Sequence, residues 1–386
     1  MDFESLSIFA FFLLIISILL IDRKNIEFGL VIIRRTKKGR KWIKKIAENN
    51  EKFFNIFANI SVFIAIILSI FGFFYLLKGT GVRLLLPKII PGEVSEGAKK
   101  VAFFIPLWYW VIGLFVIIVP HELFHGFLFS IEKIRIKSTG FLLFLIFPGG
   151  FVEPDEKQFK KSSPRKRMRV ASVGSIANMC VSIVFILLLL LWNFIGSMLF
   201  DENGVNFERT IPETPAYQGN LTGTILEIND RPIKNSLDLS IVLGEIKPGD
   251  VVRIKTTTGE FELKSVENPE NSSKGFIGIS GIYTNLELKE KYNFLSFGGK
   301  FLGVYLWFSE LFQWLIILSL SIAVANLLPF LPFDGGVMWN AIFEEISKNK
   351  DLSRKMILVL SSITYLLVLL NLFGIEKVVN FIQSLF

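Results

Sequence analysis

The stretch that carries the most information about the fold is Phe115-Val-Ile-Ile-Val-Pro-His-Glu-Leu-Phe-His-Gly-Phe-Leu-Phe129. It holds both histidines of the chain, His121 and His125, with Glu122 between them. The surrounding residues are apolar enough for the segment to lie within a membrane, where an ionisable side chain costs about 2.5–3.5 kcal/mol. Three such side chains in one helical turn need a shared reason, so the apolar setting and the polar cluster have to be explained together.

The composition of the whole chain indicates a membrane protein. The 386 residues are 52% hydrophobic, and the mean hydropathy is +0.53. These values are too apolar for a soluble globule and are typical of a multi-span protein with a soluble part. The single cysteine, Cys180, excludes an intrachain disulfide. It lies in an apolar run, and we interpret it as a small packed apolar side chain.

Apolar runs predict a polytopic α-helical membrane protein with about six transmembrane helices. The first run lacks the basic start and the cleavage site of a signal peptide, so we interpret it as a first span. The six predicted spans are residues 6–21, 53–77, 101–130, 170–200, 301–328 and 356–373.

Basic residues predict the orientation of these spans. Ten Lys and Arg side chains lie between residues 23 and 45, directly after the first span. The positive-inside rule places this loop in the cytoplasm and the N-terminus outside. Because the cluster lies between two spans, it indicates topology and contact with lipid headgroups rather than with nucleic acid.

Two apolar segments are too short and too interrupted to cross a membrane. Residues 84–91, within a predicted outer loop of residues 79–100, are broken by prolines and are expected at the interface. Residues 140–152 are predicted to form a hairpin-like, re-entrant β segment, which requires protein or water to satisfy its backbone.

Residues 201–292 differ in composition from the rest of the chain and predict an inserted small β-rich domain. We expect a strand and turn at 223–230, a helix at 235–246 capped by Ser236, and a hairpin at 251–264. Its core should contain Ile225, Leu226, Ile228, Leu239 and Leu243. The predicted topology places this domain outside the cytoplasm. The predicted parts of the chain are residues 1–100, 101–200, 201–292 and 293–386, and residues 378–386 are expected to form a surface helix.

His-Glu-x-x-His on a helix is a zinc-protease signature. His121 and His125 are about 40° apart around a helix axis and form a two-ligand platform. Glu122 lies beside that platform, where it can accept a proton from a metal-bound water and pass it to a leaving amine. Gly126 is expected to leave room beside the second ligand, and Pro120 is expected to kink the helix.

A catalytic zinc needs a third protein ligand and one open position. Asp334 is the candidate, because the predicted topology places it at the depth of the histidines. Pro329 and Pro332 break the preceding helix, and Gly335 and Gly336 permit close approach of the backbone. The alternative for Asp334 is a carboxylate wetted at the membrane interface. Glu310, a rival buried acid, is expected at the outer end of its span.

The pair of motifs resembles the site-2 protease family of intramembrane zinc metalloproteases. The second motif is Asn326-x-x-Pro-x-x-Pro-x-Asp334-Gly-Gly, and the resemblance covers the predicted third to fifth spans. It implies one Zn²⁺ held by His121, His125 and Asp334, with Glu122 as general base. It also implies that the inserted domain is similar to a PDZ module.

In that family a Gly-x-x-x-Asn pattern often follows the first motif, and Gly174 and Asn178 match it. The resemblance implies that Asn178 and Asn326 contact the substrate backbone or the oxyanion. Helix packing explains both asparagines equally well.

The re-entrant segment offers a strand edge for an unwound substrate, with Gly149 and Gly150 allowing close approach; the alternative is an interfacial anchor. We therefore expect an intramembrane zinc endopeptidase in the cell membrane that cuts transmembrane protein substrates near the cytoplasmic side. An inactive scaffold that binds peptides through the PDZ-like domain and a zinc transporter are the alternatives.

Overall fold

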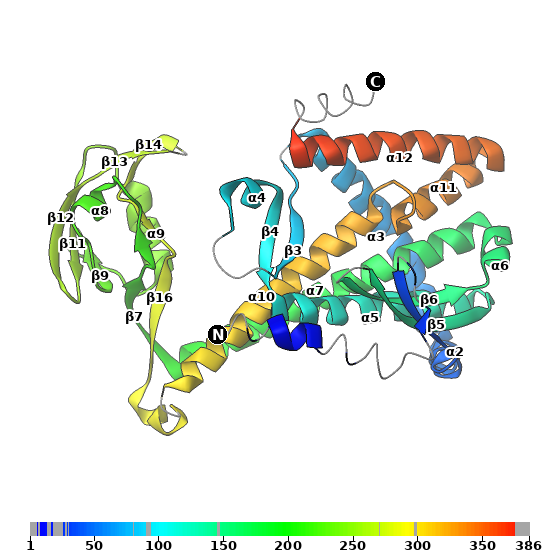
Figure 1. Cartoon of the computed structure of the whole chain (residues 1–386), viewed down its shortest axis with the longest axis horizontal. Helices are drawn as coiled ribbons and strands as arrows, with labels where there is room; N and C mark the ends of the chain where they lie inside the picture. Colours follow the sequence, from blue (N-terminus) through cyan, green and yellow to red (C-terminus); the bar gives the residue numbers. More distant parts are fainter. Residues whose placement is uncertain are drawn as a thin grey trace. The chain divides into compact units, whose positions relative to one another are not determined.

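The structure is a computed structural model that describes residues 6, 8–13, 17, 26–27, 29, 31–79, 81–89, 94–144, 147–269, 271–296 and 299–374. The chain divides into two compact units (Figure 1). One unit is formed by Met1–Leu189 together with Glu310–Phe386, and the other by Leu190–Ser309.

Five helices among the described residues are long and apolar enough to cross a membrane. They are α3 (Glu51–Leu77), α5 (Leu107–Ile131), α7 (Pro164–Leu199), α10 (Lys300–Leu327) and α12 (Lys350–Phe373). They confirm five of the predicted helices. The predicted first span at 6–21 falls largely outside the described residues, and the predicted helix at 378–386 falls wholly outside them.

The third predicted span began too early. Residues 102–106 form strand β4 (Ala102–Pro106), which pairs in parallel with β3 (Leu84–Lys88), and α4 (Glu96–Val101) precedes β4. The helix α5 therefore starts at Leu107. The proline-broken segment that we expected at the interface thus becomes a strand, because it finds a partner in residues that looked like the start of a helix.

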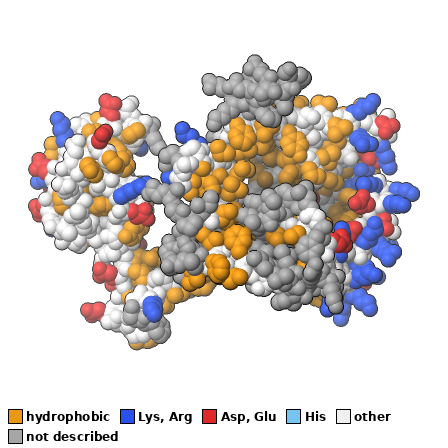
Figure 2. Space-filling model, in the orientation of Figure 1, with side chains coloured by type: hydrophobic (Ala, Val, Ile, Leu, Met, Phe, Trp, Pro, Cys, Tyr) orange, Lys and Arg blue, Asp and Glu red, His pale blue; other side chains and the backbone are white. Residues whose placement is uncertain are grey.

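The candidate membrane-spanning helices do not bury all of their large apolar side chains against protein. Phe63 on α3, Leu187 on α7 and Val359 on α12 are all exposed. Figure 2 shows hydrophobic side chains gathered over the helices, with Lys and Arg side chains concentrated at one end. This pattern suits contact with lipid. The prediction that Cys180 is packed was wrong, because its side chain lies on an exposed face of α7.

A small antiparallel sheet lies in the same unit, with the strand order β1-β2-β5-β6. Its strands are β1 (Ile26–Glu27), β2 (Val31–Thr36), β5 (Ile136–Phe144) and β6 (Phe147–Pro154). The predicted hairpin is confirmed, although its strands are longer than expected. The strand β2 and the following helix α2 (Arg40–Asn49), which both come from the basic loop, were not predicted from the sequence. The strand β6 is at the edge of this sheet.

Ion pairs connect the end of α5 to the start of α7, and α7 to the helix α11 (Asp334–Ser347). Glu132, just after α5, is paired with Arg169 of α7 at 2.6 Å and with Lys166 at 3.5 Å. Arg167 of α7 is paired with Glu344 of α11 at 2.6 Å, and both side chains are largely buried. Because a buried ion needs a well-placed partner, these contacts fix the positions of α5, α7 and α11 relative to one another.

The second unit is built on a sheet with the strand order β12-β11-β9-β7-β16, with β10 paired to β9. These strands are β12 (Gly259–Lys264), β11 (Val251–Thr256), β9 (Ile225–Ile228), β7 (Phe200–Asn206), β16 (Tyr283–Leu288) and β10 (Arg231–Pro232). The predicted hairpin is confirmed as β11 and β12. The buried cluster of this unit includes Ile225, Ile228 and Leu239, with Leu243 packed against it, whereas Leu226 is only partly buried. The cap of α9 (Ser236–Glu245) is Asn235, whose side chain accepts hydrogen bonds from the N–H groups of residues 237 and 238, and not Ser236 as predicted.

The remaining elements complete the two units. They are α6 (Glu156–Lys161), β8 (Arg209–Thr210), α8 (Pro215–Gln218), β13 (Val266–Asn268), β14 (Asn271–Phe276), β15 (Ile279–Ser280) and η2 (Glu290–Leu295).

Candidate metal centre

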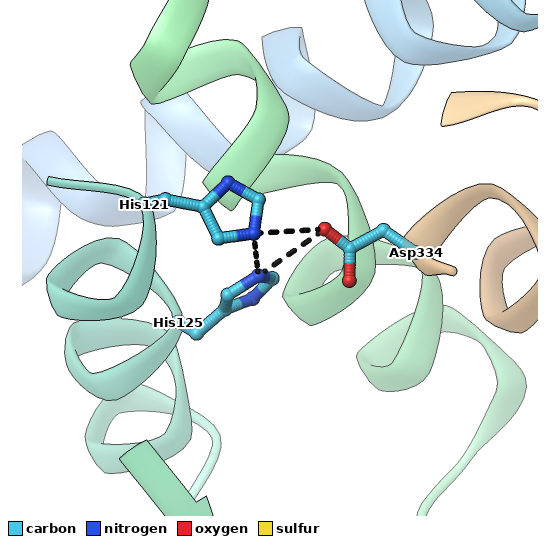
Figure 3. A group of neighbouring side chains, drawn as sticks. All are labelled: His121, His125 and Asp334. Carbon is cyan, nitrogen blue, oxygen red and sulfur yellow. Dashed lines mark hydrogen bonds and ion pairs between the residues drawn. The ribbon is translucent and has the colours of Figure 1, made fainter. Parts of the chain in front are cut away.

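Two histidines and one aspartate meet at a buried point of the helical unit (Figure 3). The Nε2 atoms of His121 and His125, both on α5, are 3.1 Å apart. Each lies 3.3 Å from Oδ2 of Asp334, the first residue of α11. Both histidines are only 8% exposed. The structure therefore brings together the three side chains that the two sequence motifs contributed.

The spacing of these atoms fits a tetrahedral cation. Bonds of about 2.0–2.1 Å to zinc at tetrahedral angles separate the ligand atoms by about 3.3 Å. The three observed separations, 3.1, 3.3 and 3.3 Å, match that value. The donor set of two imidazole nitrogens and one carboxylate oxygen leaves one position open, as in catalytic zinc sites.

The charge of Asp334 suits the same role. Burial raises the pKa of its carboxyl, but the adjacent imidazoles of His125 and His121 lower it by more, so the pKa lies below its ordinary value. The carboxylate is therefore available as an anionic ligand.

Glycines allow the close packing on which the site depends. A Cβ atom at Gly335 or Gly336 would collide with the backbone of the segment after α10, which confirms the expected close approach. A Cβ at Gly174 on α7 would collide with Nε2 of His125 and lie 2.8 Å from Nε2 of His121. Gly126 differs from the expectation: its neighbours are side chains of Ile43 and Val152 at 3.2 and 3.3 Å, so it makes room for α2 and β6.

Each histidine has a second contact that orients its ring. Nδ1 of His125 is 2.8 Å from the carbonyl oxygen of Val170, which places the proton on Nδ1 and leaves Nε2 free to bind a cation. Nδ1 of His121 is 3.2 Å from the side-chain nitrogen of Asn178. The amide oxygen of Asn178 is buried and has no hydrogen-bond partner among the described residues.

When the oxygen and nitrogen of the Asn178 amide are exchanged, the oxygen accepts a hydrogen bond from Nδ1–H of His121. This exchange gives the buried oxygen a partner and leaves Nε2 of His121 without a proton. Neither this contact nor the one with the Val170 carbonyl was predicted from the sequence, because neither group belongs to a side-chain motif for metal ligation. The hydroxyl of Ser175, also on α7, lies 3.5 Å from Asp334 Oδ2.

Glu122 lines the same cavity as the three candidate ligands. The cavity has a volume of about 330 Å³. Asn326 also lines it, and its amide nitrogen is 3.3 Å from Nε2 of His121. Oε2 of Glu122 accepts a hydrogen bond of 2.9 Å from the backbone N–H of Val152 on β6. A carboxylate, an edge strand and a cation site therefore adjoin one another.

Other candidates from the sequence lie elsewhere. A Cβ at Gly150 would lie 2.9 Å from Ile118 of α5, and one at Gly149 would lie 2.7 Å from Leu142 of β5, so these glycines mainly permit packing of β6. Glu310 is exposed and accepts hydrogen bonds from Tyr109 and Trp314. The helix α5 runs without interruption through Pro120.

Apolar helices that bring two histidines, an aspartate and a glutamate to one cavity are typical of a membrane-embedded metallohydrolase. The model of peptidase family M50 matches residues 109–371, a range that contains all four of these side chains. The chain belongs to this family, which is that of the site-2 proteases, and it is therefore an integral membrane protein and a protease. It is also 29% identical over 342 residues to an uncharacterised protein of Methanocaldococcus jannaschii, covering 84% of this chain and 80% of that protein.

Proposed function

We propose that the protein is a zinc-dependent endopeptidase that hydrolyses peptide bonds within or next to transmembrane segments, as in regulated intramembrane proteolysis. The observation that carries this proposal is the convergence of His121, His125 and Asp334 beside Glu122 in one cavity. One Zn²⁺ per chain, when bound, acts as a Lewis acid and lowers the pKa of a coordinated water to about 7.

Glu122 moves the proton in this proposal. Water adds to the carbonyl carbon of the scissile bond, and its proton passes to the Glu122 carboxylate. The C–N bond then breaks, and the leaving nitrogen takes that proton from Glu122, which returns to its charged form. The glutamate is well placed for this role because it lines the cavity without belonging to the group of three candidate ligands.

The two asparagines have different roles. Asn178 is fully buried against Nδ1 of His121, which supports orientation of that ligand in place of the substrate contact implied by the family resemblance. Asn326 lines the cavity, and its amide can donate to the oxygen that gains charge during the reaction.

The edge strand β6 supports a substrate-binding role for the re-entrant segment. The N–H of Val152 points away from β5, because it donates to Glu122. Backbone groups alternate in direction along a strand, so residues 148, 150 and 154 direct theirs to the same side as Val152. Pro148 and Pro154, however, have no N–H to donate. The edge thus offers one free amide, that of Gly150, next to the Val152 amide that holds Glu122, which suits a short, extended stretch of an unwound substrate helix.

The orientation in the membrane follows from the basic residues. We place the metal centre toward the cytoplasmic side and Leu190–Ser309 outside the cytoplasm. The five-strand path of its sheet, with α9 beside it, supports the idea that this unit is a PDZ-like module that reads or excludes the outer part of a substrate.

The test uses purified full-length protein, metal analysis and a helical single-span substrate. We expect wild type to bind one zinc and cleave the substrate, Glu122→Gln to bind zinc without cleaving, and Asp334→Ala to lose zinc. Full cleavage by Glu122→Gln would refute the general-base role. Zinc binding with no cleavage by wild type would favour an inactive scaffold, and zinc flux into vesicles would favour a transporter.

A further inference from the structure

A second cavity in the helical unit is strongly basic. It has a volume of about 660 Å³ and shares no lining residue with the metal centre. Four segments form it: the turn from β2 into α2, the helix α2 as far as Glu48, the turn from α5 into β5, and α6 through Gln158. Seven cations and one carboxylate line it, namely Lys37, Lys38, Arg40, Lys41, Lys44, Lys133, Arg135 and Glu48.

The backbone of this cavity is fixed by hydrogen bonds. Arg40 donates from Nη1 to the carbonyl oxygens of Lys137 and Ile136 at 3.0 and 3.4 Å, which ties α2 to β5. The hydroxyl of Thr139 donates to the carbonyl oxygen of Lys38 at 2.9 Å. Because these hydrogen bonds hold both ends of the turn, the protein itself positions the lysines that line the cavity.

The positive charge is poorly compensated. Among the described residues, Lys37, Lys38, Lys41 and Lys133 have no carboxylate within ion-pair distance, whereas Lys44 is paired with Glu48 at 3.6 Å. The first turn of α2 contains no acidic residue, and its cap residue offers no side-chain hydrogen bond. The N–H groups at this helix start therefore add to the attraction for an anion.

The position of the cavity indicates the source of that anion. Lys133 is the second residue after the candidate span Leu107–Ile131, and α2 leads into the candidate span Glu51–Leu77. Trp42, on α2 among these cations, is 53% exposed. Tryptophan and lysine at the ends of spans are typical of the headgroup region of a bilayer. Figure 2 shows the concentration of cations at this end of the unit.

We propose that this cavity binds the phosphate-bearing headgroup of an anionic membrane lipid. The phosphate oxygens accept from the lysine ammonium groups and from the start of α2, while Trp42 faces the interface beside them. This inference is independent of the proposed protease chemistry, since it uses none of the residues of the metal centre.

The experiment measures lipid binding to the full-length protein in nanodiscs of a neutral phosphocholine lipid containing a titrated fraction of phosphatidic acid. The double variant Lys37→Gln/Lys41→Gln removes two lining charges, and Lys45→Gln/Lys161→Gln is the matched control, because both lysines are exposed and neither lines the cavity. We expect the first variant to bind phosphatidic acid about 100-fold more weakly, at roughly 10-fold for each charge-assisted hydrogen bond to the phosphate that is lost. The control should stay within about threefold of wild type.

Equal weakening in both variants would overturn the proposal, because it would show attraction by net charge alone. A second arm titrates inorganic phosphate and pyrophosphate against the protein in purely neutral nanodiscs. Tight, saturable binding there, lost in Lys37→Gln/Lys41→Gln, would overturn the lipid as the source of the anion. Weak binding in that arm supports the headgroup.

Discussion

The glycine at position 174 offers the sharpest test of the metal centre. In Gly174→Ala the new methyl group would lie 2.8 Å from Nε2 of His121 and closer still to Nε2 of His125. An ordinary carbon–nitrogen contact needs about 3.4 Å or more, so both rings have to move by about 0.6 Å or more. Metal sites tolerate deviations of about 0.2 Å in ligand distances. We therefore expect the zinc affinity to fall about 100-fold or more, equivalent to about 2.7 kcal/mol.

The assay is competition for zinc against a chromogenic chelator, with purified protein in detergent. Gly303→Ala on α10 is the matched control, because a Cβ there meets nothing within 4 Å and the helix preference gained is the same. Thermal unfolding of the metal-free proteins shows whether both variants fold. Zinc affinity of folded Gly174→Ala within about threefold of wild type would refute the reasoning that the imidazoles occupy this space.

Three further predictions concern neighbouring contacts. In Asn178→Ala, loss of the partner of His121 Nδ1 should lower the zinc affinity about 10- to 100-fold, and an unchanged zinc titration would contradict the orienting role. Val152→Pro removes the N–H from which the Glu122 carboxylate accepts a hydrogen bond and should lower kcat with zinc content unchanged, because the general base loses its support, whereas Val152→Ala retains the N–H and should resemble wild type. Asn349→Ala removes the cap of α12 and should cost about 1 kcal/mol in thermal unfolding, largely restored by Asn349→Asp; equal loss in both would exclude capping as the cause.

The elements that could be predicted are those with a local cause. Helices α3, α7 and α12 follow from apolar runs long enough to span a bilayer, and the hairpin of β5 and β6 follows from apolar residues interrupted by prolines and glycines. The strand β2 was missed because its partner, β5, lies roughly a hundred residues further along the chain. Its composition resembles a basic loop, and only the pairing of Val31–Thr36 with β5 makes it a strand.

Helix faces were equally hard to predict. The helix α7 is apolar around most of its circumference, so the pattern does not say which side contacts protein and which faces outward. Cys180 was therefore assigned to the packed side and lies on the exposed side. The cap of α9 was misplaced by one residue because Asn235 and Ser236 are both good capping residues, and only the backbone conformation distinguishes them.

By itself the sequence determined the apolar spans and the kinds of ligand atoms, because helix formation and donor chemistry are properties of neighbouring residues. It also supplied Asp334 as the third candidate ligand through its second motif. The tertiary structure alone decided that Nε2 of His121, Nε2 of His125 and Oδ2 of Asp334 lie 3.1–3.3 Å apart. It alone placed Asn178 beside Nδ1 of His121 and the N–H of Val152 beside the Glu122 carboxylate. Such distances depend on how α5, α7, α11 and β6 pack against one another.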